Sequence, residues 1–139
     1  MNAVDTNVLL YSVDDDEPIK QGQARMLIRQ LVAGSDARVL LWQVLAETVN
    51  QLRRWQNLGE LTEVEFEQHV KTFRSLFPLA VPSLAVLDQA LDFAKHHSLS
   101  FWDSMILGAC SEAGVATLYT EDMGSPRDID GIQLVNPFV

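Results

Sequence analysis

The chain begins with MNAVDTN, residues 1–7, in which a short apolar segment leads directly into Asp5. The apolar residues Met1–Val4 predict a buried strand, and Asp5 then stands at its carboxyl end. Three further acidic residues lie within or beside apolar or helix-like runs: Glu47, Asp103 and Asp122. Hard cations such as Mg²⁺ prefer oxygen ligands, so these four carboxylates predict a divalent-metal site if the fold brings them together.

Five short apolar segments predict strands, and they are continuous runs, as is typical of strands covered on both faces. They are Met1–Val4, Arg38–Leu41, Leu79–Val81, Ala116–Tyr119 and Ile132–Val135. Helical patterns lie between the first four of these segments, including a run over residues 42–55 that contains Glu47. The alternation predicts an α/β fold with a mostly parallel sheet and helices on both faces.

Capping residues mark the helix boundaries. Pro18 suits a first turn and begins a helix that is expected to run to about residue 33. Thr62 followed by Glu65 forms a capping box for a helix to about residue 77. Ser83 caps a helix to about residue 97, and Gly114 ends a helix that begins near residue 103.

Composition limits the function classes. The 139 residues predict a single domain over 1–139, and the net charge of −9 argues against nucleic-acid binding through bulk positive charge. It leaves open an enzyme that reaches phosphates through bound metal. No apolar run approaches the ~20 residues of a membrane span, and the start of the chain lacks a signal-peptide core, so a cytoplasmic protein is expected. The single Cys110 is expected to be a small buried hydrophobe.

The acidic residues would converge if the first and fourth strands were neighbours, because ligands of parallel sheets bind beyond the carboxyl ends of the strands. Two unit charges ~4 Å apart repel by about 4 kcal/mol at an effective dielectric near 20, so such a cluster favours a cation. An all-oxygen set favours Mg²⁺ or Mn²⁺ over zinc. The histidines lack metal-ligand spacing to one another: His69, His96 and His97.

Each acidic residue also has a simpler interpretation. Asp5 and Asp103 stand where helix-capping residues are favoured. Glu47 lies at the edge of the apolar arc of its helix and could keep its carboxylate in water. Glu121 and Asp122 are adjacent, so they are expected to point in different directions.

The ordered set of motifs resembles the PIN domain family, specifically the VapC-like toxin ribonucleases of type II toxin–antitoxin systems. The matching segments are Val4–Leu9, Val44–Glu47, Ser100–Ile106, Leu118–Asp122 and Gly131–Phe138. Together they span almost the whole chain, and although each segment is short, their order is specific.

The resemblance implies a three-layer α/β/α sandwich with a five-stranded parallel sheet in the order 3-2-1-4-5. It assigns metal binding and catalysis to four positions, which are Asp5, Glu47, Asp103 and Asp122. Asn7 and Thr120 match accompanying polar positions and are expected to support the site, and the pattern favours Asp122 over Glu121. The family also implies homodimers and a cognate antitoxin that covers the active site.

The function expected from these residues and the resemblance is that of a Mg²⁺- or Mn²⁺-dependent endoribonuclease that cleaves RNA by metal-activated water. The alternative is a non-catalytic PIN-like binding module whose acidic pocket docks a basic partner segment. A receiver-like phosphoacceptor domain is disfavoured because it would need a lysine after a late strand, and none follows Lys95.

Large apolar side chains are numerous for so small a core. They include Trp42, Trp55, Phe73, Phe77 and Phe101. Some could simply be core residues, but we expect others to line a homodimer interface or an antitoxin groove.

Overall fold

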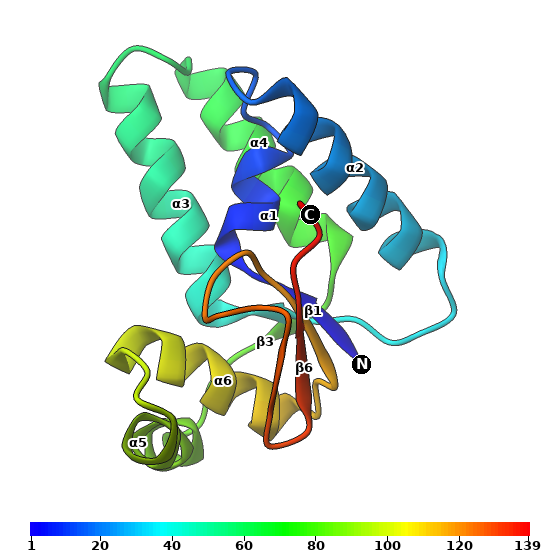
Figure 1. Ribbon diagram of the computed structural model, residues 1–139. Coiled ribbons are helices and arrows are strands. Elements are labelled where there is room, and N and C mark those ends of the chain that lie inside the picture. The colour runs from blue at the N-terminus through cyan, green and yellow to red at the C-terminus, as the bar shows by residue number, and fades with distance from the viewer.

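The computed structural model describes residues 1–139, and helices lie on both sides of its central strands (Figure 1). The elements follow in the order β1 (Asn2–Val4), α1 (Thr6–Tyr11), α2 (Pro18–Ala33), β2 (Leu40–Leu41), α3 (Trp42–Asn57), α4 (Glu63–Leu76), β3 (Leu79–Ala80), α5 (Leu84–His97), α6 (Phe101–Ala113), β4 (Thr117–Tyr119), β5 (Arg127–Ile129) and β6 (Ile132–Val135). In Figure 1, α1 to α4 gather on one side of the strands and α5 and α6 on the other. The expected α/β fold is confirmed.

The strands do not form the single five-stranded parallel sheet that was expected. One sheet has four strands in the order β1-β4-β6-β5, and a separate sheet pairs β2 with β3. The pairs β1–β4, β4–β6 and β2–β3 are parallel, whereas β5 is antiparallel to β6. Between the two sheets there is only a parallel bridge from Asn2 to Arg38, because β2 gives way to α3 after two residues and cannot extend the ladder.

Strand β5 was missed because its residues, Arg127–Ile129, are mostly polar and exposed. The sequence signal for it was the turn rather than the strand. Asp130 and Gly131 connect β5 to β6, and both have positive φ angles, of 51° and 89°. A two-residue turn of this kind matches the twist of a hairpin, and Asp-Gly is a favoured sequence for it. The hairpin makes the four-stranded sheet mixed.

The predicted helix boundaries are largely confirmed. Pro18 begins α2, and the reciprocal capping box of Thr62 and Glu65 begins α4 with hydrogen bonds of 3.0 and 3.1 Å. Helix α6 differs from expectation because Ser100 is its cap and its first residue is Phe101. Asp103 therefore lies within the first turn of α6, where a negative charge is favoured by the helix dipole.

Helix α6 is held against α5 by an unusually close approach. A Cβ atom at Gly108 would lie 2.7 Å from the backbone oxygen of Val86, so only glycine fits there without a shift of α5. The buried Cys110 lies on the same helix, and burial raises the pKa of its thiol, which agrees with its expected role as a small apolar side chain.

No helix combines the length and apolar character that crossing a membrane requires.

Candidate active site

The candidate site lies where β1 and β4 end side by side. The backbone N–H of Asp5 donates to the carbonyl of Tyr119 at 2.9 Å, which continues the parallel pairing beyond both strands. Asp5 and Thr120 are therefore neighbours although they are far apart in sequence. Their side chains are buried, with Asp5 only 4% exposed. The carboxyl edge of a parallel sheet is the usual place for a ligand site.

Asp5 is held by both of its carboxylate oxygens. Oδ1 accepts from the backbone N–H of Thr6 at 2.7 Å, and Oδ2 accepts from the hydroxyl of Thr120 at 2.8 Å. The first of these bonds caps the six-residue helix α1, so the helix-cap interpretation of Asp5 is correct. It does not exclude a second role, because a carboxylate has more acceptor sites than one cap uses.

Asp122 and Asn7 form the outer part of the site. Asn7 Nδ2 donates to Asp122 Oδ2 at 3.1 Å, while the backbone N–H of Asp122 donates to the Thr120 hydroxyl at 3.0 Å. The amide oxygen of Asn7 is buried and has no hydrogen-bond partner. An unpaired buried acceptor is costly, so this oxygen is available to a donor or a cation.

Glu47 reaches the site from α3. Its Oε2 accepts from the hydroxyl of Thr6 at 2.8 Å, and its Oε1 accepts from Gln43 Nε2 at 2.7 Å. The half-buried carboxylate thus has a donor on each oxygen, as the edge position in the apolar arc of α3 required.

Electrostatics link three of the four predicted carboxylates. Burial raises the pKa of Asp5 from 3.8 to about 6, against the lowering effect of the hydrogen bonds from Thr120 and Thr6. The negative charges of Glu47 and Asp122 raise it further. Like charges in one buried region favour protonation or a cation.

Asp103 is less closely joined to the others. It is half-buried in the first turn of α6, and its backbone N–H donates to the hydroxyl of Ser100 at 3.1 Å. No hydrogen bond connects its carboxylate to Asp5, Glu47 or Asp122. A polar link to its neighbour Trp102 is made by Gln43, which donates to both Glu47 and the carbonyl of Trp102.

The donors of this region suit a hard divalent cation, since they are carboxylate and amide oxygens and include the unpaired oxygen of Asn7. As arranged here, however, no three Asp, Glu, His or Cys side chains lie close enough together to hold one metal ion. The chemistry of the donors fits a metal, whereas the predicted four-carboxylate cluster is not drawn together. Mutual repulsion opposes the approach of carboxylates that no cation compensates.

A comparison with protein-family models decides the family. The model described as the PIN domain matches residues 3–130, which is most of the chain. This chain belongs to the PIN domain family.

Solved structures of other proteins have the same PIN fold. A toxin–antitoxin complex from Klebsiella pneumoniae contains a chain 17% identical with a TM-score of 0.70, covering 99% of this chain and 98% of that one. VapC20 of Mycobacterium tuberculosis, described as a toxin that cleaves the sarcin–ricin loop, is 17% identical with a TM-score of 0.64 over 89% of this chain and 92% of its own. VapBC2 of Rickettsia felis, solved with a fragment of its promoter DNA, is 14% identical with a TM-score of 0.69 over 96% of both chains. A comparison with curated proteins found no match.

Glu121 is engaged away from the other carboxylates of this PIN domain. It accepts hydrogen bonds from Lys20 and from the Tyr11 hydroxyl, each 2.9 Å long. The Lys20 ammonium also lies 4.6 Å from the centre of the Tyr11 ring, and the bond to Glu121 raises the pKa of Lys20. Glu121 and its neighbour Asp122 therefore have different partners, as their adjacency predicted.

Two polar residues of the site were not found by sequence reasoning. Thr6 and Gln43 both donate to Glu47, one from α1 and the other from the preceding turn of α3. The signal for Gln43 was its spacing, since side chains four residues apart are neighbours on a helix. Thr6 offered no comparable signal, because its contact depends on how α1 and α3 pack.

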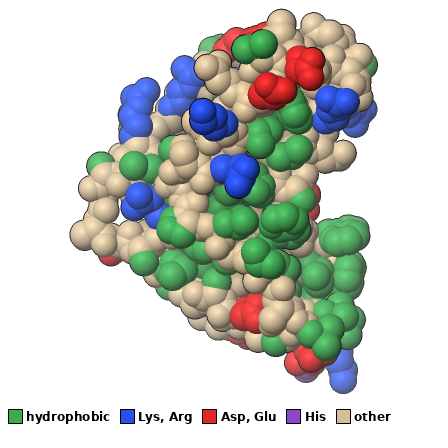
Figure 2. Space-filling view, turned by 180° about the vertical axis from the view of Figure 1, so that it is seen from behind, with side chains coloured by type: hydrophobic (Ala, Val, Ile, Leu, Met, Phe, Trp, Pro, Cys, Tyr) green, Lys and Arg blue, Asp and Glu red, His purple; other side chains and the backbone are tan.

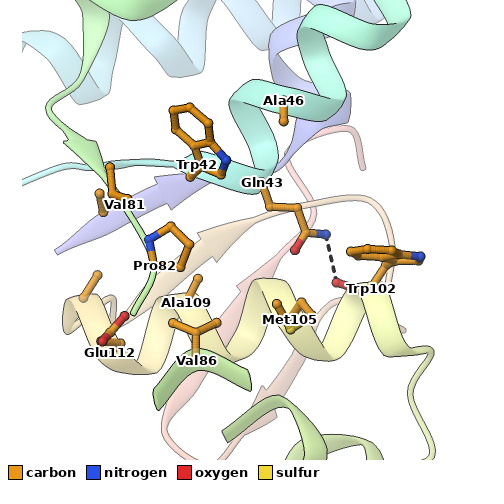
Figure 3. Close-up of a pocket in the computed structure, with 12 residues that line it drawn as sticks. Trp42, Gln43, Ala46, Val81, Pro82, Val86, Trp102, Met105, Ala109 and Glu112 are labelled. Atoms are coloured by element: carbon orange, nitrogen blue, oxygen red, sulfur yellow. Dashed lines mark hydrogen bonds between the residues drawn. The ribbon is translucent and has the colours of Figure 1, made fainter. Parts of the chain in front are cut away.

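An apolar cleft adjoins the acidic residues of the PIN domain. It has a volume of about 440 Å³ and lies between α3, α5 and α6, with Trp42, Trp102 and Met105 among its lining residues (Figure 3). Figure 2, a view from behind, shows hydrophobic side chains gathered around the indentation at the right-hand edge. Trp42 is 48% and Trp102 62% exposed.

The large apolar side chains singled out in the sequence fall into two groups, core residues and exposed residues. Phe73 and Phe77 are core residues, and Trp55 packs against the core. Trp42 and Phe101 remain exposed, so these two are available to a partner.

Proposed function

We propose that this PIN domain is a divalent-metal-dependent endoribonuclease and the toxin of a toxin–antitoxin pair. The observation that supports the chemistry best is the buried Asp5, whose pKa is raised to about 6 by burial and by the charges of Glu47 and Asp122. Such a group gains most from a cation, because a bound cation favours the ionised form that burial disfavours. The likeness in fold to toxins, one of them described as cleaving the sarcin–ricin loop, supports the biological role.

In this proposal, Asp5, Asp103 and Asp122 hold Mg²⁺ or Mn²⁺, and Glu47 contributes directly or through a water molecule. A divalent metal in such a site lowers the pKa of a water molecule and stabilises the leaving oxygen of a phosphodiester. Thr120 orients Asp5, Thr6 orients Glu47, and Asn7 orients Asp122 through their hydrogen bonds. No histidine is required as a general base.

RNA would reach the site in spite of the net charge of −9 because metal ions offset the local negative charge. A few Arg or Lys contacts to phosphates would then make binding weaker as salt rises. The partner of the site would be an antitoxin segment that inserts Arg or Lys near Asp5 and Asp103. Arginine suits this role, since it can make bidentate contacts to carboxylates.

The test is RNA cleavage by the purified protein with Mn²⁺, with Mg²⁺ and with chelator. Cleavage that stops with chelator and returns with Mn²⁺ is the expected result. The variant Asp122→Asn should be much less active, and Glu121→Gln serves as the matched control because Glu121 has other partners. A parent protein that cleaves no RNA under any of these conditions would favour the non-catalytic binding module instead.

A further inference from the structure

Gln43 occupies the boundary between the acidic site and the apolar cleft. It lies in the first turn of α3, four residues before Glu47, and its side chain forms part of the wall of the cleft. In Figure 3 the Gln43 side chain extends from α3 toward the start of α6, among side chains that are mostly apolar. A polar side chain in such a wall has a cost unless its amide is bonded.

The amide of Gln43 makes two hydrogen bonds to different helices. Nε2 donates to Glu47 Oε1 at 2.7 Å and to the carbonyl oxygen of Trp102 at 3.0 Å. Both partners are acceptors only, and the amide nitrogen has two hydrogens, so the amide must present its NH₂ group to them. The orientation of this amide group therefore follows from the hydrogen-bonding chemistry of its two partners.

The first bond limits the freedom of Glu47. A glutamate side chain has several rotatable bonds, and ordering it has an entropic cost. Here Thr6 holds Oε2 and Gln43 holds Oε1, so the carboxylate is held from both sides. Without Gln43 only the Thr6 bond would remain, and the Glu47 carboxylate could turn about it.

The second bond connects α3 to the beginning of α6. Trp102 directly precedes Asp103, the one predicted site carboxylate residue that shares no hydrogen-bonding residue with the others. Gln43 donates to Glu47 and to the Trp102 carbonyl from one NH₂ group. It therefore connects Glu47 to the turn of α6 that contains Asp103. Hydrogen bonds of this kind, together with packing, hold the groups of a site at a constant spacing.

We propose that Gln43 is a positioning residue that orients Glu47 and sets the spacing between α3 and the Asp103 turn of α6. The proposal rests on the proposed metal-dependent function, and it assigns to Gln43 no contact with RNA. Hydrogen-bonding partners of metal ligands affect metal affinity and activity without touching the reacting atoms, typically by 10–100-fold when they are removed.

The experiment compares Gln43→Met, Gln43→Ala and the control Gln51→Met. Methionine keeps the length and helix propensity of glutamine but has no N–H donor. Gln51 lies on the same helix and makes no side-chain hydrogen bond, so its replacement measures the effect of the substitution alone. Mn²⁺ affinity is measured by calorimetry on protein freed of metal, and kcat and KM are measured on an RNA oligonucleotide.

We expect Gln43→Met to bind Mn²⁺ about tenfold or more weakly. At Mn²⁺ concentrations that saturate both proteins, it should lose kcat by a similar factor, with KM for RNA unchanged. Gln43→Ala should behave like Gln43→Met, because both lack the donor, and Gln51→Met should match the parent. Two results would overturn the proposal: Mn²⁺ affinity of Gln43→Met equal to that of the parent, or a raised KM with kcat unchanged, which would mean contact with RNA.

The proposed function can fail separately. If the parent cleaves no RNA, the ribonuclease proposal is wrong, while the Mn²⁺ titrations still decide on Gln43. If Gln43→Met keeps the parental affinity and Gln43→Ala does not, side-chain volume rather than hydrogen bonding is responsible, and the positioning role is wrong.

Discussion

The hydroxyl of Thr120 joins two carboxylate residues at once, since it donates to Asp5 Oδ2 at 2.8 Å and accepts from the backbone N–H of Asp122 at 3.0 Å. Thr120 is fully buried, so neither bond can be replaced easily by water. This hydroxyl connects the end of β4 to the carboxylate after β1. The orientation of Asp5 depends on it.

Replacing Thr120 by valine should therefore destabilise the protein by about 1–3 kcal/mol, because a buried acceptor and a donor lose their partner. Chemical denaturation measures the free energy of unfolding. Thr48→Val is the matched control, since Thr48 is equally buried but its hydroxyl donates only to Val44 within its own helix. A Thr120→Val loss no larger than that of Thr48→Val would contradict the linking role.

Asp5→Asn should remove most RNA cleavage while the metal-free protein remains folded. The substitution removes one of several like charges, so the free energy of unfolding in chelator should hold or rise. Cleavage with Mn²⁺ and melting temperature in chelator are measured together, with Glu121→Gln as control. Unfolding of Asp5→Asn without metal would mean that the Asp5 carboxylate serves the fold itself, through its bonds to Thr6 and Thr120.

The contribution of Asp5 to metal-free stability should fall as pH rises from about 4 to about 6. The folded protein binds the Asp5 proton with a pKa of about 6 and the unfolded chain with a pKa near 3.8, so between these values the folded state holds more protons. The difference corresponds to about 3 kcal/mol of stability present at low pH and lost above pH 6. Melting temperatures in chelator from pH 4 to pH 8 measure it, and the difference between parent and Asp5→Asn isolates the contribution of Asp5. Parallel curves for the two proteins would mean that the pKa of Asp5 is not raised.

Mn²⁺ should raise the melting temperature of the parent more than that of Asp5→Asn, Asp103→Asn or Asp122→Asn. Binding to the folded state adds stability that grows with affinity, by about 2.7 kcal/mol at a hundredfold excess over Kd. The Asp103→Asn result is the most informative, because Asp103 shares no hydrogen-bonding residue with the other carboxylates. An Asp103→Asn shift equal to that of the parent would remove Asp103 from the metal ligands.

The exposed aromatic residues beside the cleft should support self-association. We expect the protein to be a homodimer at micromolar concentration and Trp42→Glu to weaken the dimer, because Trp42 exposes a large apolar surface next to Trp102. Light scattering over a range of concentrations gives the mass. A parent protein that is monomeric throughout that range would refute the dimer.

The acidic motifs and the helix boundaries could be found from the sequence because both depend on local chemistry. Thr62 and Glu65 specify a helix start through hydrogen bonds between residues three positions apart. The apolar segment before Asp5 predicts a strand whichever strand it pairs with. The PIN family assignment likewise followed from an ordered set of short segments and was confirmed by the match over residues 3–130.

The tertiary structure alone decided which of these groups meet. The prediction of a single five-stranded parallel sheet was not confirmed, because the two-residue strands β2 and β3 form a separate ladder and a polar strand, β5, pairs with β6. The pairs β3–β2, β1–β4 and β4–β6 are nevertheless parallel neighbours, as the predicted order required. The contact of Glu47 with Thr6 joins residues 41 positions apart in the sequence, and that of Asp5 with Thr120 joins residues 115 positions apart. Contacts between residues so far apart in the sequence are set by helix and strand packing. Local sequence specifies which residue types are present and which elements they begin or end. The partners of each carboxylate, and the raised pKa of Asp5, depend on burial and on neighbours that only the folded chain supplies.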